Sequence, residues 1–158
     1  QPRSRGLGDV YKRQALPETL RERLDFIEDP CSYDATLWQN LQQQQGLPLA
    51  LDFALGDTAP ADFFAVWKPA WQAKPRQLQP QRCIVTSAMD HPLGQAWAAW
   101  NAAATCPDAL CGLRTDHLYA PDAFQEMLGP WQPTWPPIPG TGLGFDELLT
   151  QLTWTRLS

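Results

Sequence analysis

The sequence predicts an α/β fold built on a parallel sheet, because short apolar runs alternate with longer segments of helix-forming composition. The predicted strands lie near residues 25–28, 48–52, 62–68, 82–87 and 109–112. Polar residues close four of these runs: Glu28, Asp52, Lys68, and the pair Thr86 and Ser87. The carboxyl ends of parallel strands meet at one edge of a sheet, where α/β barrels and doubly wound sheets bind their ligands. The pattern therefore predicts one shared site at that edge.

Two helices are predicted between the strands. Residues 32–45 can be capped by Ser32 or Asp34, carry an apolar face and end at Gly46. Residues 93–106 are rich in alanine and tryptophan, so we expect this helix to be buried on much of its surface.

The first fourteen residues are not expected to belong to the fold. Ser4 to Gln14 resembles the conceptual translation of a transposon-end sequencing adapter at all eleven positions, so the natural polypeptide is expected to begin near Ala15. A natural basic tail is the alternative. Removing the four basic residues and one acid of segment 1–14 from the 12 and 17 of the whole chain leaves 8 and 16, a net charge of −8. No basic stripe remains for phosphates, which argues against nucleic acid as a partner.

The cysteines and the hydrophobic pattern bear on location. No pair among the four cysteines has C-x-x-C spacing, and no apolar run approaches the ~20 residues of a membrane span. A reduced, cytoplasmic protein without a membrane partner is expected, and nothing in the sequence fixes its oligomeric state. The tail, residues 129–158, is rich in proline, tryptophan and glycine, so we expect it to be extended and packed through its aromatic side chains. A polyproline ligand for a partner domain is the alternative.

Glu28, Asp52 and Lys68 form the candidate site. Neighbouring strands lie about 4.8 Å apart, so carboxylates at two adjacent strand ends can share one hard cation, preferentially Mg²⁺, with a third ligand still required. A lysine on the following strand would lie beside that cation, where it could transfer protons or bind an anionic intermediate. Simpler interpretations exist for each residue. Glu28 could be a solvated strand end and Asp29 a helix cap. Asp52 could cap a turn, and Lys68 could extend to solvent.

Four segments carry a family resemblance: F-I-E-D-P-C at 26–31, P-L-A-L-D at 48–52, V-W-K-P at 66–69 and V-T-S-A-M-D-H-P-L-G at 85–94. In this order they resemble the carboxyl-terminal half of the muconate-lactonising subgroup of the enolase superfamily. The T-S-A-M-D segment and C-G-L-R-T-D-H-L-Y at 111–119 are most similar to the o-succinylbenzoate synthase family within that subgroup. The resemblance runs from about Leu20 to Tyr119, and more loosely to Asp146.

This resemblance implies a fold, a reaction and residue roles. Residues 15–128 would form part of a truncated (β/α) barrel, and the tail 129–158 would pack on the barrel or on a capping domain. Glu28 and Asp52 would be two of three Mg²⁺ ligands, and Lys68 would stabilise an enolate-like intermediate. The substrate would be contacted by Thr86, Ser87, Asp90, Gly112 and Leu113. The implied reaction removes water from a small-molecule carboxylate, 2-succinyl-6-hydroxy-2,4-cyclohexadiene-1-carboxylate, and yields o-succinylbenzoate for menaquinone biosynthesis.

The chain also departs from the family pattern. The family's remaining metal ligand and its general base would precede Ala15, so this chain alone is expected to be inactive. Phe53 and Asp90 each stand where the family usually has glutamate, and the connection 69–82 is short for a barrel helix. Two alternatives follow. One is a racemase or epimerase acting on N-acyl amino acids or dipeptides, with Lys68 as acid and base; the other is a non-catalytic pseudoenzyme or binding module.

Overall fold

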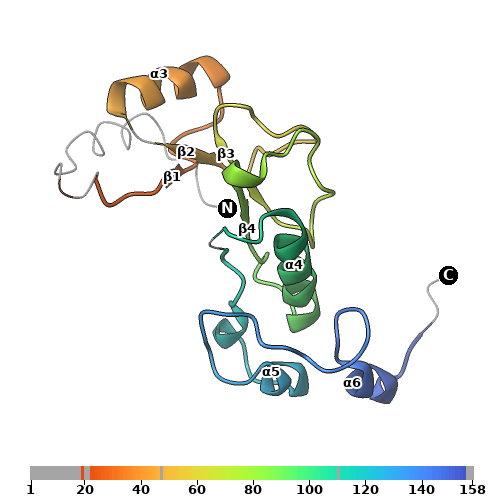
Figure 1. Cartoon of the computed structure of the whole chain (residues 1–158). Coiled ribbons are helices and arrows are strands. Elements are labelled where there is room, and N and C mark those ends of the chain that lie inside the picture. Colours follow the sequence, from red (N-terminus) through yellow and green to blue (C-terminus); the bar gives the residue numbers. More distant parts are fainter. Residues whose placement is uncertain (1–18, 20–21, 47, 110, 156–158) are drawn as a thin grey trace. The chain divides into compact units, whose positions relative to one another are not determined.

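The computed structural model describes residues 19, 22–46, 48–109 and 111–155 (Figure 1). The segment 1–14, which the sequence sets apart, lies outside these residues. The chain divides into two compact units, which are described separately below. The first unit comprises residues 1–67 and 73–84, and the second comprises residues 68–72 and 85–158.

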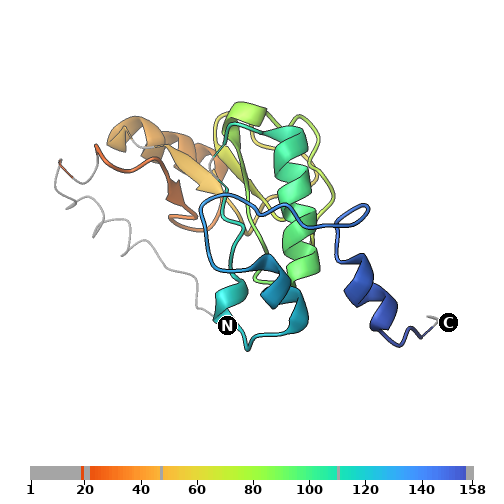
Figure 2. The ribbon, with the colours of Figure 1, turned by 60° about the horizontal axis from the view of Figure 1, so that its bottom comes forward.

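A four-stranded parallel sheet gives the chain a mixed α/β fold, which is compatible with part of an enolase-type barrel. Its order is β1-β2-β3-β4, where the strands span Ile27–Glu28, Leu49–Leu51, Phe64–Trp67 and Cys83–Val85. In the register of the sheet, Glu28 lies opposite Ala50, and Ala50 lies opposite Phe64. Figure 2 shows β1 and β2 side by side in the first unit.

The central strands of the sheet are buried on both faces. The three residues of β2 are at most 4% exposed, and Ala65 to Trp67 of β3 are at most 2% exposed. Successive residues of a strand point to opposite faces, so three buried residues in a row require that both faces are covered. Parallel strands covered in this way read as continuous apolar runs, which is why the sequence revealed their positions.

Helix α3 (Ala35–Gln45) confirms the predicted helix and identifies its cap. The side chain of Asp34 accepts a hydrogen bond of 2.8 Å from the backbone N–H three residues later. Gly46 ends the helix in the left-handed conformation, at a φ of 63°. Trp38, on the apolar face, is fully buried. Asp34, and not Asp29, is therefore the aspartate that caps a helix here.

Helix α4 (Pro92–Thr105) of the second unit lies where a helix was predicted, and seven of its fourteen residues are buried, as expected. Ala98 is fully buried and Ala96 is 4% exposed. Trp97 and Trp100 are 39% and 54% exposed, and their rings stack with centroids 5.2 Å apart. Residues three apart share a helix face, so the two indoles cover each other on the solvent side of α4. The tryptophan pair thus lies on the exposed part of a helix that is otherwise buried on much of its surface.

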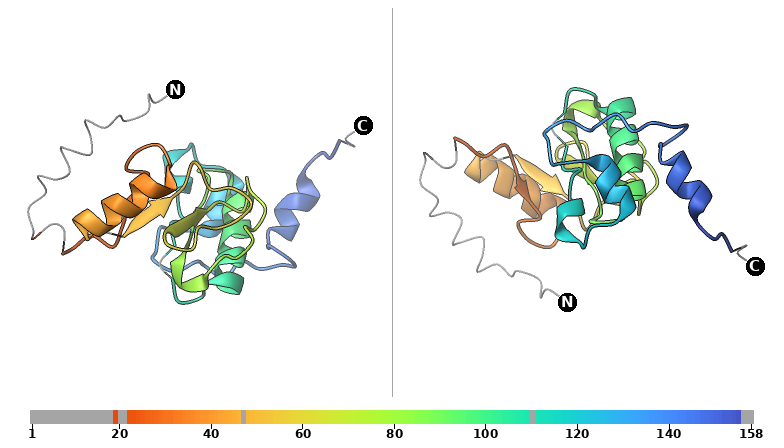
Figure 3. Two further views of the ribbon diagram at one scale, coloured as in Figure 1. Left: turned by 90° about the horizontal axis from the view of Figure 1, so that it is seen from above. Right: turned by 90° about the horizontal axis from the view of Figure 1, so that it is seen from below.

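The second unit has a core of its own. Ala96 of α4 packs with Phe124 and Leu128 of the short helix α5 (Ala123–Leu128), and with Phe145. The ribbons of α4 and α5 lie side by side (Figure 3). The rings of Phe124 and Phe145 lie 5.4 Å apart. No helix in the described part of the chain is long and apolar enough to cross a bilayer.

The tail is extended over most of the stretch that precedes α6 (Asp146–Gln151), a helix that the sequence did not predict. Trp135 and Ile138 pack against the core of the second unit. Trp131 and Trp154 are 63% and 70% exposed. Aromatic side chains therefore anchor only part of the tail.

Of the fifth predicted strand, 109–112, residue 110 lies outside the described residues, and the others contribute a single parallel bridge, between Thr86 and Gly112. Ala109 belongs to the preceding turn, because its N–H donates to the carbonyl of Cys106 at 3.0 Å. The prediction therefore overestimated the length of this strand.

Candidate metal centre

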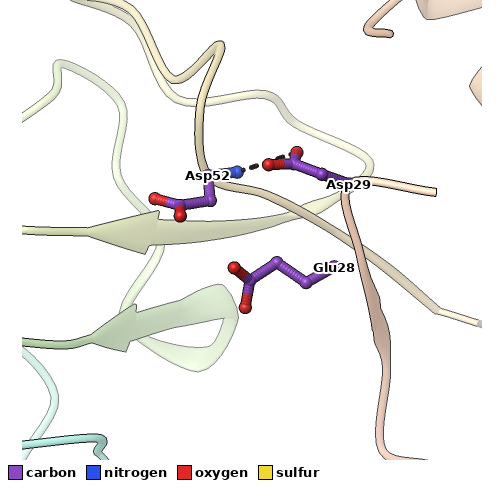
Figure 4. A group of neighbouring side chains, drawn as sticks. All are labelled: Glu28, Asp29 and Asp52. Carbon is purple, nitrogen blue, oxygen red and sulfur yellow. Dashed lines mark hydrogen bonds between the residues drawn. The ribbon is translucent and has the colours of Figure 1, made fainter. Parts of the chain in front are cut away.

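Three carboxylates meet where β1 and β2 end (Figure 4). Glu28 is the last residue of β1, Asp29 follows it, and Asp52 follows β2. The parallel register places these positions at the same edge of the sheet. One oxygen of each carboxylate lies within 4.8 Å of an oxygen of the other two. The structure thus brings Glu28 and Asp52 together and adds Asp29 to them.

The chemistry of this group fits a hard divalent cation. Asp52 is only 4% exposed, Asp29 is half-buried and Glu28 is exposed. Like charges at this separation repel each other, and the repulsion grows where water is excluded. Mg²⁺ prefers carboxylate oxygens and retains several waters, so it could bind here with only part of its coordination sphere supplied by this chain.

Asp29 is the member of the group that sequence reasoning missed as a site residue. Its two carboxylate oxygens accept the backbone N–H groups of Asp52 at 3.2 Å and Phe53 at 3.0 Å. Its backbone has a φ of 39°, a conformation that aspartate tolerates better than most residues. The sequence pattern that could have pointed to Asp29 is an aspartate placed between a strand-ending glutamate and a proline. The interpretation of Asp29 as a helix cap is wrong, because its side chain bonds the chain that follows β2.

Lys68 directly follows β3 in the sequence but belongs to the second unit. Its backbone carbonyl accepts the N–H groups of Trp71 at 2.9 Å and Gln72 at 3.0 Å, so a tight turn begins at this residue. The side chain is half-buried. The predicted approach of Lys68 to the two carboxylates stays a prediction.

Four of the expected substrate residues lie on two neighbouring segments of the second unit. Gly112 donates its N–H to the carbonyl of Val85 at 3.1 Å and accepts the N–H of Ser87 at 2.8 Å. A Cβ atom on Gly112 would lie 3.3 Å from the methyl group of Thr86, so a larger residue would press on that side chain. Leu113 follows and is half-buried. The structure therefore brings Thr86, Ser87 and Gly112 together.

Asp90, the fifth expected substrate residue, lines a cavity of about 310 Å³ in the second unit, together with residues that include His91 and Tyr119. Both of its carboxylate oxygens are buried, and neither has a hydrogen-bond partner among the described residues. Gly94, in the first turn of α4, makes room for this carboxylate, since a Cβ atom there would lie 1.9 Å from Oδ2. The placement of Asp90 thus depends on a glycine one turn into the helix.

A buried ion pair follows the segment at Gly112. Arg114 donates from Nε and Nη2 to the two carboxylate oxygens of Asp116 at 2.7 and 3.0 Å, and both side chains are at most 6% exposed. Nη2 also donates to the carbonyl of Gly129 at 3.1 Å. The hydrogen bonds from Arg114 hold the pKa of Asp116 below its ordinary value, against the opposing effect of burial. This pair ties the segment after Gly112 to the start of the tail.

The pair predicts a pH dependence of stability. Because the pKa of Asp116 is lower in the folded state than in the unfolded state, its stabilising contribution is complete above the ordinary value of about 3.9 and is lost as the pH falls through the folded value. We expect the free energy of unfolding to decrease less below about pH 4 in Asp116→Asn than in the unmodified chain. Urea denaturation at a series of pH values around and below pH 4 measures the free energy of unfolding of each protein. The control is Asp108→Asn, which removes an exposed carboxylate. Equal pH profiles for all three proteins would contradict the prediction.

The comparisons with known proteins give one relative. No family model matches the chain. An o-succinylbenzoate synthase of Bdellovibrio bacteriovorus is 32% identical over an alignment of 157 positions, which covers 90% of this chain and 47% of that protein. The chain therefore spans about half the length of the curated relative that it matches. The match supports a distant relationship to this lyase.

Proposed function

We propose that this chain is the carboxyl-terminal half of a magnesium-dependent lyase that dehydrates 2-succinyl-6-hydroxy-2,4-cyclohexadiene-1-carboxylate to o-succinylbenzoate in menaquinone biosynthesis. The name of the distant relative supports the reaction. The single observation that carries the proposal is the group of Glu28, Asp29 and Asp52 at two adjacent strand ends. A cation bound at such a place can stabilise the negative charge that develops when a proton next to a carboxylate is removed.

Each residue has a role in this proposal. When bound, Mg²⁺ supplies positive charge to the substrate carboxylate and so makes the neighbouring proton easier to remove. Glu28 and Asp52 would hold the cation through carboxylate oxygens. Lys68 would place its ammonium charge against the enolate-like intermediate. The substrate would be contacted by Thr86, Ser87, Asp90, Gly112 and Leu113. The general base and the remaining metal ligand would come from the other half of the parent protein, so we expect this chain alone to be inactive.

Metal binding by the 158-residue chain tests the first part of the proposal. Mn²⁺, a paramagnetic substitute for Mg²⁺, allows the bound ion to be counted by electron paramagnetic resonance. We expect Glu28→Gln and Asp52→Asn each to weaken Mn²⁺ binding at least about tenfold, since loss of a residue that only supports a metal ligand already has an effect of this size.

The matched control is Asp57→Asn, which removes an exposed carboxylate of the first unit that is not part of the group. This variant should bind Mn²⁺ like the unmodified chain. Equal affinity in the control and in both site variants would overturn the assignment of the metal site.

A further inference from the structure

Asp29 uses its carboxylate oxygens as hydrogen-bond acceptors for the protein backbone. Both oxygens of Asp29 accept backbone N–H groups of the residues that follow β2. We propose that Asp29 is a positioning residue, which fixes Asp52 at the end of β2 and leaves cation binding to Glu28 and Asp52. This inference rests on the proposed function, because it needs a cation at the site.

The hydrogen-bond ladder between β1 and β2 shows why a side chain is needed. Ile27 donates its N–H to the carbonyl of Pro48 at 2.9 Å, and Asp29 donates to the carbonyl of Ala50 at 3.0 Å. In a regular parallel ladder, the N–H of Asp52 would next donate to the backbone carbonyl of Asp29. It donates to Oδ1 of the Asp29 side chain (Figure 4). The carboxylate therefore continues the ladder past the end of β1.

The backbone conformation of Asp29 allows its side chain to replace its backbone carbonyl as the acceptor. A φ of 39° turns the chain out of the extended conformation of β1 directly after Glu28. A residue with a Cβ atom needs about 1–2 kcal/mol to adopt the left-handed region, and aspartate can recover part of this by local hydrogen bonding. The bonds from Asp52 and Phe53 have the same effect, although these residues lie more than twenty positions further along the chain. The turn that ends β1 and the placement of Asp52 thus depend on the same side chain.

The consequence for the site is a division of roles. The Asp52 side chain is almost completely buried, so its direction is set by its backbone and by its packing. Fixing the N–H groups of Asp52 and Phe53 fixes that backbone on both sides of the Asp52 Cα. Each oxygen of Asp29 keeps one further lone pair, so direct ligation is the competing hypothesis. Affinity alone does not separate the two, because removal of a nearby negative charge also weakens cation binding.

Two variants of Asp29 separate the hypotheses when they are compared with Glu28→Gln. Asp29→Gly tolerates the positive φ but has no side-chain acceptor. Asp29→Asn also tolerates this conformation, and it keeps one carbonyl acceptor for a backbone N–H. Each is made in the 158-residue chain and loaded with Mn²⁺. The measurements are Mn²⁺ affinity, the number of waters on the bound ion from ¹⁷O-water line broadening, and amide hydrogen exchange at Asp52 and Phe53.

We expect Asp29→Gly to weaken Mn²⁺ binding about tenfold, the usual effect of losing a residue that supports a metal ligand. Asp29→Asn should weaken Mn²⁺ binding less than Asp29→Gly does. The number of waters should stay unchanged in both variants, whereas Glu28→Gln should gain one water in place of the lost ligand. Amide exchange at Asp52 and Phe53 should become at least about tenfold faster in Asp29→Gly, since hydrogen bonding limits exchange. Unchanged exchange in α3 would show that the variant is folded.

The outcomes that overturn the inference differ from those that overturn the proposed function. An added water in Asp29→Gly would make Asp29 a ligand, and unchanged amide exchange at Asp52 and Phe53 would show that it fixes nothing. If the unmodified chain binds no Mn²⁺, the proposed metal function fails, and the positioning role fails with it.

Discussion

Replacing Lys68 with alanine in the proposed parent lyase is expected to lower kcat for o-succinylbenzoate formation by about 100- to 1,000-fold, the effect of losing one preorganised group that stabilises developing negative charge. Burial and hydrogen bonds fix the backbone on both sides of Lys68. Trp67, which precedes Lys68 and ends β3, is 2% exposed, and the carbonyl of Lys68 closes a turn with Trp71 and Gln72. Product formation under saturating substrate and Mg²⁺ measures the effect.

Lys74 provides the matched control, because it and Lys68 are the only lysines after residue 14, and Lys74 is exposed. Lys74→Ala should keep full activity. Lys68→Arg should keep part of the activity if the charge alone matters. Retained turnover in Lys68→Ala would contradict the role assigned to it. Exchange of the substrate α-proton with deuterium in the absence of dehydration would indicate a racemase or epimerase.

Replacing Trp38 with alanine is expected to lower the free energy of unfolding of the first unit by about 3–5 kcal/mol, the cost of truncating a large buried aromatic side chain. Trp38 is fully buried, and its ring meets the rings of Tyr33 and Phe63 edge-on at 5.3 and 5.4 Å. Its indole N–H donates to the carbonyl of Ser32 at 3.3 Å. Urea denaturation followed at amide signals of α3 and β2 measures the loss.

Two further variants separate packing from hydrogen bonding. Trp38→Phe keeps the aromatic contacts but loses the hydrogen bond to Ser32, so it should cost much less than the alanine variant. Phe53→Ala truncates a side chain of the same unit that is 84% exposed, and it should change stability by no more than about 0.5 kcal/mol. Losses of the same size at Trp38 and Phe53 would contradict the packing argument.

The parts of the fold that the sequence could predict are those governed by local rules. The strands β1 to β4 lie within predicted ranges. The central strands β2 and β3 were recognisable because strands buried on both faces read as unbroken apolar runs. Helix α3 was predictable from a capping aspartate, an apolar face and a final glycine. The meeting of Glu28 and Asp52 followed from the common direction of parallel strands.

What could not be predicted depends on contacts between distant residues or on a single backbone angle. The side chain of Asp29 bonds to residues more than twenty positions away. It does so from a left-handed backbone conformation, which the sequence does not show. The exposure of Trp97 and Trp100 is likewise set by which face of α4 the core of the second unit takes. Composition identifies a buried helix but does not say which large side chains remain outside.

The two compact units are interleaved along the gene. Residues 68–72 belong to the second unit although the first unit continues at residues 73–84, so no single break in the coding sequence separates the two units intact. A recombination event or an engineered split between residues 84 and 85 would leave Lys68 on the piece that carries the first unit. The whole segment 68–72 would then stay with Glu28 and Asp52 and be separated from residues 85–158, the larger part of its own unit.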